Sequence, residues 1–390
     1  MINFDFVSPT KIYFGKDKEN EIGTILKERN AHKVLIVAGT SSIFKSGLYD
    51  RIVALLDKKS ISYITFRGVR ANPTKSKAKE GLTLARENNV DYILAIGGGS
   101  VIDTAKLIAC AYNYDGDIFD FNLHKAKPTS ALPIGVILTI SASGSELSSS
   151  CVIQDDELEM KKGFNSDLVR PEFVIENPEL TYSVSKEQTA YGIVDIFMHT
   201  FERYMQPSSE IEPADGFAET VMKSVIKAGK IAYDNPCDYE SRAVLMLMSS
   251  LSHNGLTNIG KSFLMPVHQL EHAISGKYPF VAHGAGLAVL FAKWSMYYLP
   301  YEIDKFDSFA RNVFDLHNPD KYQNGLAGIK KMDEFFTSLN MPKTFKDLGI
   351  EDVDVFSLAK LVSDNGKRII HQKSKDMDES VMIEIYRMCL

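Results

Sequence analysis

Four of the nine histidines in the chain fall into a pattern that suits metal chemistry. Asp195 and His199 stand four residues apart in a stretch with helical periodicity, which places both on one face of a helix. His268 and His272 have the same spacing, and His283 follows after a turn. One carboxylate and three imidazoles suit a divalent first-row metal ion. The set Asp195, His199, His268 and His283 would bind such an ion and leave one coordination position open for an oxygen.

The alternative explanation is that each pair arises by coincidence from the polar residues of a helix and binds no metal. Two such pairs and a third histidine, in a chain that also has a glycine-rich loop, favour the metal site. The remaining histidines are isolated in the sequence and are interpreted as surface or packing residues: His32, His124, His253, His317 and His371.

A second group of residues predicts a site for an anionic cofactor. Gly97, Gly98 and Gly99 follow a strand-like apolar run and precede a helix-like segment. Three glycines let the backbone approach a ligand, and the N–H groups at a helix start face an anion such as a pyrophosphate. Ser100 is predicted to cap this helix, with Asp103 at its third position. A tight turn without a ligand is the alternative, since the common GxGxxG fingerprint is absent.

A polar loop after the next apolar run adds hydroxyl groups to the same expected region. The run is Pro133–Leu138, and the loop contains Thr139, Ser141 and Ser143. Such residues suit the crevice at the carboxyl ends of a parallel sheet, where ligands bind in doubly wound folds. A serine-rich surface loop is the alternative.

The elements that must position these residues divide the chain into two parts. Over residues 1–181, short apolar runs alternate with helical periodicity, which predicts a doubly wound α/β domain. Over residues 182–390, long helical periodicities predict an all-helical domain. The expected strands are Lys33–Ala38, Ser62–Phe66, Asp91–Ile96 and Pro133–Leu138, and the expected helices include Leu48–Lys58, Ser76–Asn88, Lys186–Tyr204, Ala214–Ala232, Tyr239–Asn254 and Ala285–Tyr298.

Composition and charge exclude several classes of protein. The 390 residues are 45% hydrophobic and 24% charged, which is ordinary for a globular chain and not for a disordered or fibrous one. A net charge of −6 makes nucleic acid an unexpected partner. No apolar run reaches the roughly 20 residues of a membrane span, so no membrane association is expected. Four scattered cysteines and an N-terminus without a signal-peptide pattern predict a cytoplasmic protein.

Together these motifs resemble those of the iron-containing, group III alcohol dehydrogenases, and in particular their NADPH-dependent butanol dehydrogenase and aldehyde reductase branch. The resemblance covers nearly the whole chain. It implies a Rossmann-like N-terminal domain followed by an all-α C-terminal domain, the architecture shared with dehydroquinate synthase. It also implies a homodimer or larger homo-oligomer. The motifs are GGGSVIDTAK at 97–106, LTISASGSE at 138–146, NPELT at 177–181, GIVDIFMHTFE at 192–202, HQLEH at 268–272 and HGAGLA at 283–288.

The resemblance also assigns roles to residues. Asp195, His199, His268 and His283 would bind the metal, with Fe(II) the expected ion and Zn(II) the alternative. His272 would be the catalytic residue beside the nicotinamide and the substrate, without binding metal. The nicotinamide cofactor would contact Gly39, Thr40, Ser41, Asn72, Gly97, Gly98, Gly99, Ser100, Asp103, Thr139, Ser141, Ser143, Lys161, Leu180 and His272.

Two positions depart from the family pattern. The spacing from His272 to His283 is one residue longer than in many members, so the intervening turn must absorb the extra residue. Members that prefer NAD often carry an Asp at the end of the first strand, where this chain has Gly39 followed by Thr40 and Ser41. Small hydroxyl-bearing residues leave room and donors for a 2′-phosphate, so NADP(H) is the predicted cofactor.

The predicted reaction is hydride transfer between NADP(H) and a small uncharged aldehyde or primary alcohol, such as butanal or butanol. A polyol oxidoreductase similar to glycerol dehydrogenase is one alternative. A non-redox cyclase similar to dehydroquinate synthase is another, but it would need Lys and Arg near the metal. A non-catalytic nucleotide-binding or metal-binding regulator and a structural protein with an incidental metal are further alternatives. The neighbours of the metal motifs are mostly apolar, which favours the uncharged substrate: Phe197, Met198, Phe201, Leu264, Met265, Leu270, Phe280 and Val281.

Overall fold

The computed structural model describes residues 2–206 and 213–390, and the chain forms two compact units. The first unit comprises Val7–Val184. The second comprises Ser185–Leu390 together with the N-terminal segment up to Phe6. The sequence placed its boundary after Thr181 and did not indicate that the N-terminal segment belongs with the second unit.

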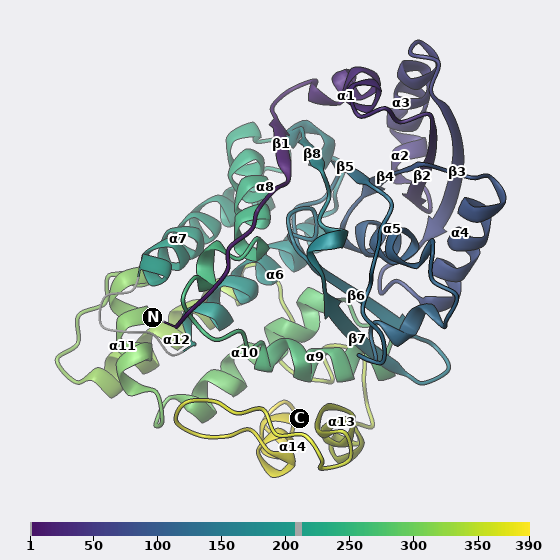
Figure 1. The fold of residues 1–390 in the computed structure, drawn as a ribbon. Coiled ribbons are helices and arrows are strands. Elements are labelled where there is room, and N and C mark those ends of the chain that lie inside the picture. The colour runs from purple at the N-terminus through teal and green to yellow at the C-terminus, as the bar shows by residue number, and fades with distance from the viewer. Residues whose placement is uncertain (1, 207–212) are drawn as a thin grey trace. The chain divides into compact units, whose positions relative to one another are not determined.

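The first unit is built on a six-stranded sheet in which every neighbouring pair is parallel (Figure 1). The strand order is β1-β8-β5-β4-β2-β3. The central strands β4 and β5 are buried along their whole length, as expected of parallel strands covered on both faces. The bounds are β1 (Lys11–Phe14), β2 (Lys33–Gly39), β3 (Ser62–Val69), β4 (Tyr92–Gly97), β5 (Ile134–Leu138) and β8 (Phe173–Glu176).

Helices cover both faces of this sheet because its strands are apolar on both sides. Val34 and Ile36 of β2 belong to a core with the helices α1 (Ile22–Glu28) and α3 (Leu48–Asp57). The alternate residue Val37 is buried on the opposite face, where it pairs with Phe66 of β3. There α4 (Lys75–Glu87) and α5 (Gly99–Ala111) pack against the strands. The predicted doubly wound α/β architecture is confirmed.

The strand order identifies the place where a ligand should bind. From β2 the chain first adds β3 on one side and then crosses back to add β4 on the other side. The loops that follow β2 and β4 therefore diverge at a topological switch point, the usual ligand crevice of such sheets. These loops begin at Gly39 and Gly97, two of the residues predicted to contact the cofactor.

Several smaller elements were not predicted from the sequence. The antiparallel hairpin of β6 (Ser150–Asp155) and β7 (Met160–Asn165) follows the polar loop after β5. The strands β1 and β8 were also missed, since each has only four residues. A four-residue α2 (Ser42–Lys45) follows β2, and short 3-10 helices span Lys18–Glu21, Ile118–Asp120, Asp167–Val169, Pro178–Thr181 and Leu256–Asn258.

The described part of the second unit consists of helices, as predicted. Lys186–Tyr204 was expected as a helix and is α6 with the same bounds. Ser185 caps it by accepting a hydrogen bond from the backbone N–H of Gln188. The other helices are α7 (Pro213–Asp234), α8 (Tyr239–His253), α9 (Pro266–Lys277), α10 (His283–Tyr298), α11 (Ile303–Phe314), α12 (Lys321–Ser338), α13 (Val355–Ser363) and α14 (Glu379–Arg387).

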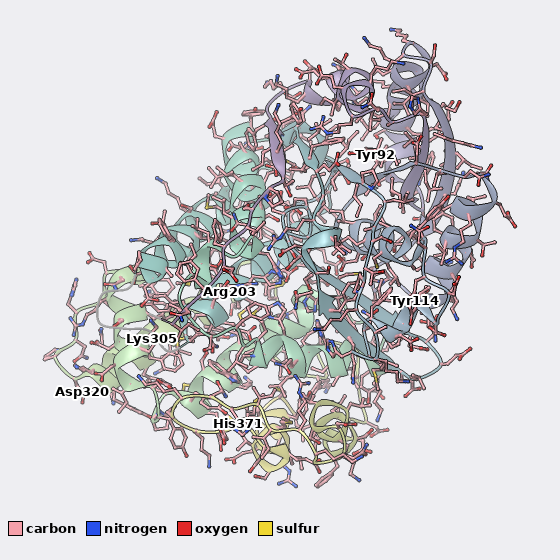
Figure 2. The ribbon with its side chains drawn as sticks, in the orientation of Figure 1. Tyr92, Tyr114, Arg203, Lys305, Asp320 and His371 are labelled. Carbon is pink, nitrogen blue, oxygen red and sulfur yellow. The ribbon has the colours of Figure 1, made fainter. Side chains whose placement is uncertain are left out.

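An aromatic cluster lies in the core of the helical unit, and α6 contributes Phe197 and Phe201 to it. Phe197 stacks on Phe201 and makes edge contacts with Phe291, Phe309 and Phe336, at ring separations of 5.7 to 6.3 Å. Because other helices surround α6 beyond its exposed first turn, most of its polar residues from Thr189 onward are buried as well. Figure 2 shows the side chain of one of them, Arg203, among the helices of this unit.

Membrane spans and disulfides are not features of the described residues. No described helix is both long enough and apolar enough to cross a membrane. Cys110, Cys151 and Cys389 are buried free thiols, and Cys237 is an exposed one.

Candidate metal and cofactor sites

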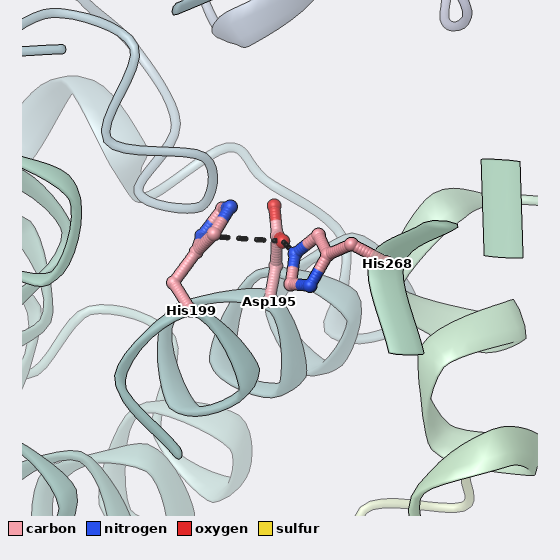
Figure 3. Close-up of side chains that lie close together, drawn as sticks. All are labelled: Asp195, His199 and His268. Atoms are coloured by element: carbon pink, nitrogen blue, oxygen red, sulfur yellow. Dashed lines mark ion pairs between the residues drawn. The ribbon is translucent and has the colours of Figure 1, made fainter. Parts of the chain in front are cut away.

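The helix α6 presents Asp195 and His199 on one face, as their spacing predicted. Both side chains are buried, and Asp195 Oδ1 lies 3.5 Å from His199 Nδ1. His268 approaches the same carboxylate from α9, with its Nε2 3.6 Å from Asp195 Oδ1 (Figure 3). His283, the first residue of α10, brings its Nε2 to 3.7 Å from the same oxygen. The structure therefore brings the four predicted ligands together from three helices.

The longer spacing between His272 and His283 does not displace the last ligand. The helix α9 ends at Lys277, and the segment from Tyr278 to Ala282 turns the chain into α10. This turn absorbs the additional residue.

Asp195, His199 and His268 offer ligand atoms that all lie within 4.8 Å of one another, a cluster that fits a divalent metal ion, and His283 approaches this cluster at Asp195 Oδ1. Asp195 Oδ1, His199 Nδ1 and His268 Nε2 are buried and have no hydrogen-bond partner among the described residues. A tetrahedral site with metal–ligand distances of about 2.1 Å separates its donor atoms by about 3.4 Å. The separations of 3.5 to 3.7 Å around Asp195 Oδ1 are close to that value. Buried polar atoms without partners are costly, and a cation at their centre would satisfy all of them.

Two buried glutamates orient two of the imidazoles, and the sequence analysis missed both. Glu202 of α6 pairs with Nδ1 of His268 and accepts a hydrogen bond from the backbone N–H of Val267 at 2.6 Å. Glu271 of α9 pairs with Nδ1 of His283. A carboxylate on Nδ1 fixes the tautomer and the ring plane, so that Nε2 is directed at the metal position. The two glutamates are thus part of the site although neither would touch the ion.

Burial and neighbouring charges shift the pKa values of His199 and His268 in opposite directions. Burial, followed by the neighbouring histidines, lowers the pKa of His199 well below its ordinary value. Burial by itself would also lower the pKa of His268, but the carboxylates of Glu202 and Asp195 outweigh it and raise this pKa to about 9. Without metal, His268 therefore holds a proton more readily than His199 does.

His272 lies beside the four-residue set and not within it. Its ring centroid is 5.4 Å from that of His283 and 6.4 Å from that of His268. Its nearest potential ligand atoms belong to Glu271 and His283, which already pair with each other. The role of His272 beside nicotinamide and substrate stays a prediction.

One of the histidines interpreted as isolated is not isolated. The ring of His253, at the end of α8, packs edge-on against His199 with a centroid separation of 4.2 Å. Sequence spacing gave no signal, because 54 residues separate the two positions. The other four isolated histidines are exposed, as predicted: His32, His124, His317 and His371.

The apolar neighbours of the metal motifs provide less support for an uncharged substrate than the sequence suggested. Phe197, Phe201 and Leu270 are completely buried in the helical core. Residues that fill a core do not line a substrate pocket. Phe280 is the opposite case, since 66% of its surface is exposed.

The predicted cofactor loops lie side by side at the carboxyl end of the sheet. The backbone N–H of Thr139 donates to the carbonyl of Gly97 at 3.1 Å, which joins the loop after β5 to the loop after β4. A Cβ atom at Gly98 would overlap Cγ2 of Ile140, and one at Gly99 would overlap Oγ of Ser143. Glycine is therefore required at these positions for the two loops to pack together.

The prediction that Ser100 caps the following helix is wrong. The helix α5 begins at Gly99 with Gly98 as its N-cap, so Ser100 already lies in the first turn. Asp103 does not complete a capping box either, because its buried carboxylate accepts hydrogen bonds from Ser145 Oγ at 2.6 Å and from Val152 N at 3.1 Å. Burial raises the pKa of this carboxyl above its ordinary value. Asp103 thus ties α5 to the loop after β5 and to β6.

Lys161 and Asn72, both predicted to contact the cofactor, form a hydrogen bond with each other. Lys161 of β7 donates from Nζ to Oδ1 of Asn72 at 3.0 Å, and Asn72 lies in the loop after β3 with a positive φ of 55°. Leu180 lies in the 3-10 helix Pro178–Thr181 and packs against the sheet core. Ser41 is the N-cap of α2, and its hydroxyl makes no capping hydrogen bond.

Replacing Gly98 by alanine should weaken cofactor binding. Ile140 is β-branched and stiff, so the new methyl group must push the loop after β5 away from the glycine loop. We expect the Kd of the nicotinamide cofactor, measured by fluorescence titration, to rise about tenfold, which corresponds to about 1.4 kcal/mol. Gly216→Ala is the matched control, because a Cβ atom there meets open space in α7. Equal Kd values for the two variants would contradict the proposed contact.

Models of one protein family match both parts of the chain. Residues 9–178 match the model described as iron-containing alcohol dehydrogenase, and residues 189–390 match that of the C-terminal part of the Fe-containing alcohol dehydrogenase family. NADH-dependent butanol dehydrogenase A of Clostridium acetobutylicum is 42% identical over 90% of each chain. NADPH-dependent aldehyde reductase YqhD of Escherichia coli is 31% identical over 94% of each chain.

Solved structures give the same result. The crystal structure of NADH-dependent butanol dehydrogenase A from Thermotoga maritima superimposes with a TM-score of 0.95 and 33% identity. The alignment covers 100% of this chain and 99% of the other.

Proposed function

This chain belongs to the iron-containing alcohol dehydrogenase family, and from that premise we propose that it interconverts small uncharged aldehydes and primary alcohols, of the butanal and butanol type, with NADP(H). Family membership makes it an NAD(P)-dependent alcohol dehydrogenase that uses a divalent metal. The observation that carries the proposal is the convergence of Asp195, His199, His268 and His283 on one point. The butanol-type substrate is supported by the names of the relatives.

In the proposed mechanism, the metal ion has one role. A divalent ion held by the four ligands, Fe(II) with Zn(II) as the alternative, supplies Lewis acidity toward a carbonyl oxygen. Glu202 and Glu271 hold the rings of His268 and His283 in the orientation that this requires. His272 lies next to His283 and is proposed to contact nicotinamide and substrate and to hold a proton there. The hydride passes between cofactor and substrate, so no protein nucleophile is needed.

The preference for NADP(H) rests on the end of β2. Gly39 is the last residue of the strand, and the segment Gly39–Ser42 carries no carboxylate that would repel a 2′-phosphate. The hydroxyl of Ser41, which makes no capping hydrogen bond, supplies a donor at the same place. The names of the relatives do not decide the question, since the butanol dehydrogenase is named for NADH and the aldehyde reductase for NADPH.

A homodimer or larger homo-oligomer in the cytoplasm completes the proposal. The strand β1 lies at the end of the strand order, so its outer edge has no strand partner among the described residues. An unpaired edge is a template for pairing with another copy. The four free cysteines support a reducing compartment.

The decisive experiment measures butanal-dependent oxidation of NADPH and of NADH. The protein is stripped of metal under anaerobic conditions and reloaded with Fe(II) or Zn(II). We expect turnover only after reloading, with a kcat/KM at least about tenfold higher for NADPH than for NADH, a difference of about 1.4 kcal/mol. A preference for NADH would refute the proposed cofactor and keep the enzyme class. Absence of turnover with either metal would refute the proposed substrate.

A further inference from the structure

The three imidazoles around Asp195 are not held in place by the same kind of contact. The rings of His268 and His283 are each held by a glutamate on Nδ1. His199 has no such carboxylate among the described residues, because its only ion-pair partner there is Asp195 itself. Its Nδ1 faces Asp195 and is the atom that would bind the metal, so the contrast with His268 and His283 is the lack of an orienting carboxylate on the other side of the ring among the described residues. Something other than a second carboxylate must therefore fix the plane of the His199 ring.

The neighbouring rings supply this constraint. His268 stacks on His199 with a centroid separation of 4.5 Å and an interplanar angle of 24°. His253 meets His199 at 4.2 Å and 64°, an edge-to-face contact. Such contacts are favourable and directional, so a ring held by a stacked neighbour and an edge-on neighbour has a defined orientation. His253 is itself fixed as the last residue of α8, a 15-residue helix capped by Asp238.

We propose that His253 is a positioning residue that holds the metal ligand His199 by ring packing, as the glutamates hold the other two histidines by hydrogen bonds. The inference rests on the proposed metal site and concerns how that site is preorganised. It assigns a role to a histidine that sequence spacing left isolated, and it requires the aromatic ring of His253 and not its nitrogen atoms.

The test compares His253→Ala with His253→Phe in metal-free protein titrated with Co(II) against a competing chelator. Removing the partner of a metal ligand typically weakens metal binding 10- to 100-fold, so we expect a Kd for Co(II) at least about tenfold higher in His253→Ala. The visible absorption of bound Co(II) should also change, because the free rotation of His199 distorts the ligand geometry. His253→Phe keeps an aromatic edge and should retain the wild-type spectrum and a Kd within about twofold of wild type. Replacing the exposed His317 by alanine is the control.

The outcomes separate this inference from the proposed function. If wild-type protein does not bind Co(II), the metal site itself is wrong. If wild type binds and His253→Ala has the wild-type Kd and spectrum, His253 does not position His199. If both variants lose affinity to the same extent, the nitrogen atoms matter and the ring-packing role is refuted. The melting temperature of each metal-free variant shows whether a loss of affinity comes from a loss of fold.

Discussion

Replacing His268 by alanine is expected to abolish metal retention and activity together. The side chain supplies one of four donors that meet at Asp195 Oδ1, and its removal also leaves the buried carboxylate of Glu202 without its imidazole partner. Loss of the Lewis acid should lower the rate by at least about a thousandfold, equivalent to about 4 kcal/mol of transition-state stabilisation. Metal content after gel filtration and butanal reduction with NADPH measure the two effects on the same preparation.

The matched control is His371→Ala. His371 is an exposed histidine that pairs with Asp376, so its loss should change neither metal content nor rate. If the His268→Ala protein loses its metal but keeps its activity, the proposed Lewis-acid role is wrong. Metal content that stays at the wild-type level would instead refute His268 as a ligand.

Replacing Glu202 by glutamine should weaken metal binding by about 10- to 100-fold, although Glu202 would not touch the ion. The amide oxygen can still accept from the backbone N–H of Val267, but the negative charge on Nδ1 of His268 is lost. A less basic imidazole is a weaker ligand, and its ring is less firmly held. Competition with a chelator gives the metal affinity, and the rate at saturating metal should recover most of the wild-type value.

The same variant has a second signature that a general loss of stability would not produce. In the metal-free wild-type protein, Glu202 and Asp195 raise the pKa of His268 to about 9 against the opposing effect of burial. Removing the charge of Glu202 should therefore lower this pKa, which NMR titration of the imidazole resonances can follow. Glu334→Gln is the control, since Glu334 is exposed and pairs only with Lys331 among the described residues. An unchanged metal affinity in Glu202→Gln would show that the glutamate is not needed to orient His268.

Local patterns in the sequence predicted most of the strands and helices. They also predicted two parts of the candidate site, the pair Asp195 and His199 and the glycine loop. The alternation of apolar runs and helical periodicity predicted β2, β4, β5 and the helices between them. The bounds of α6 were predicted to the residue, because Ser185 is a strong cap and the periodicity continues to Tyr204. Asp195 and His199 were correctly placed on one face, since residues four positions apart are neighbours on the same face of a helix. The three glycines were correctly placed at a junction between a strand and a helix, and they span the last residue of β4, the N-cap and the first residue of α5.

The tertiary structure determined the features that depend on contacts between residues far apart in the sequence. Glu202 lies 66 residues from His268, and no short-range pattern links a glutamate to a histidine over that distance. The capping role given to Asp103 was wrong and the packing partner of His253 was not identified for the same reason, because their contacts come from other helices and loops. The strand order and the unit to which the N-terminal segment belongs are likewise set by long-range packing. The sequence by itself determined which groups could bind a metal, whereas the packing of α6, α8, α9 and α10 decided which side chains orient the ligands.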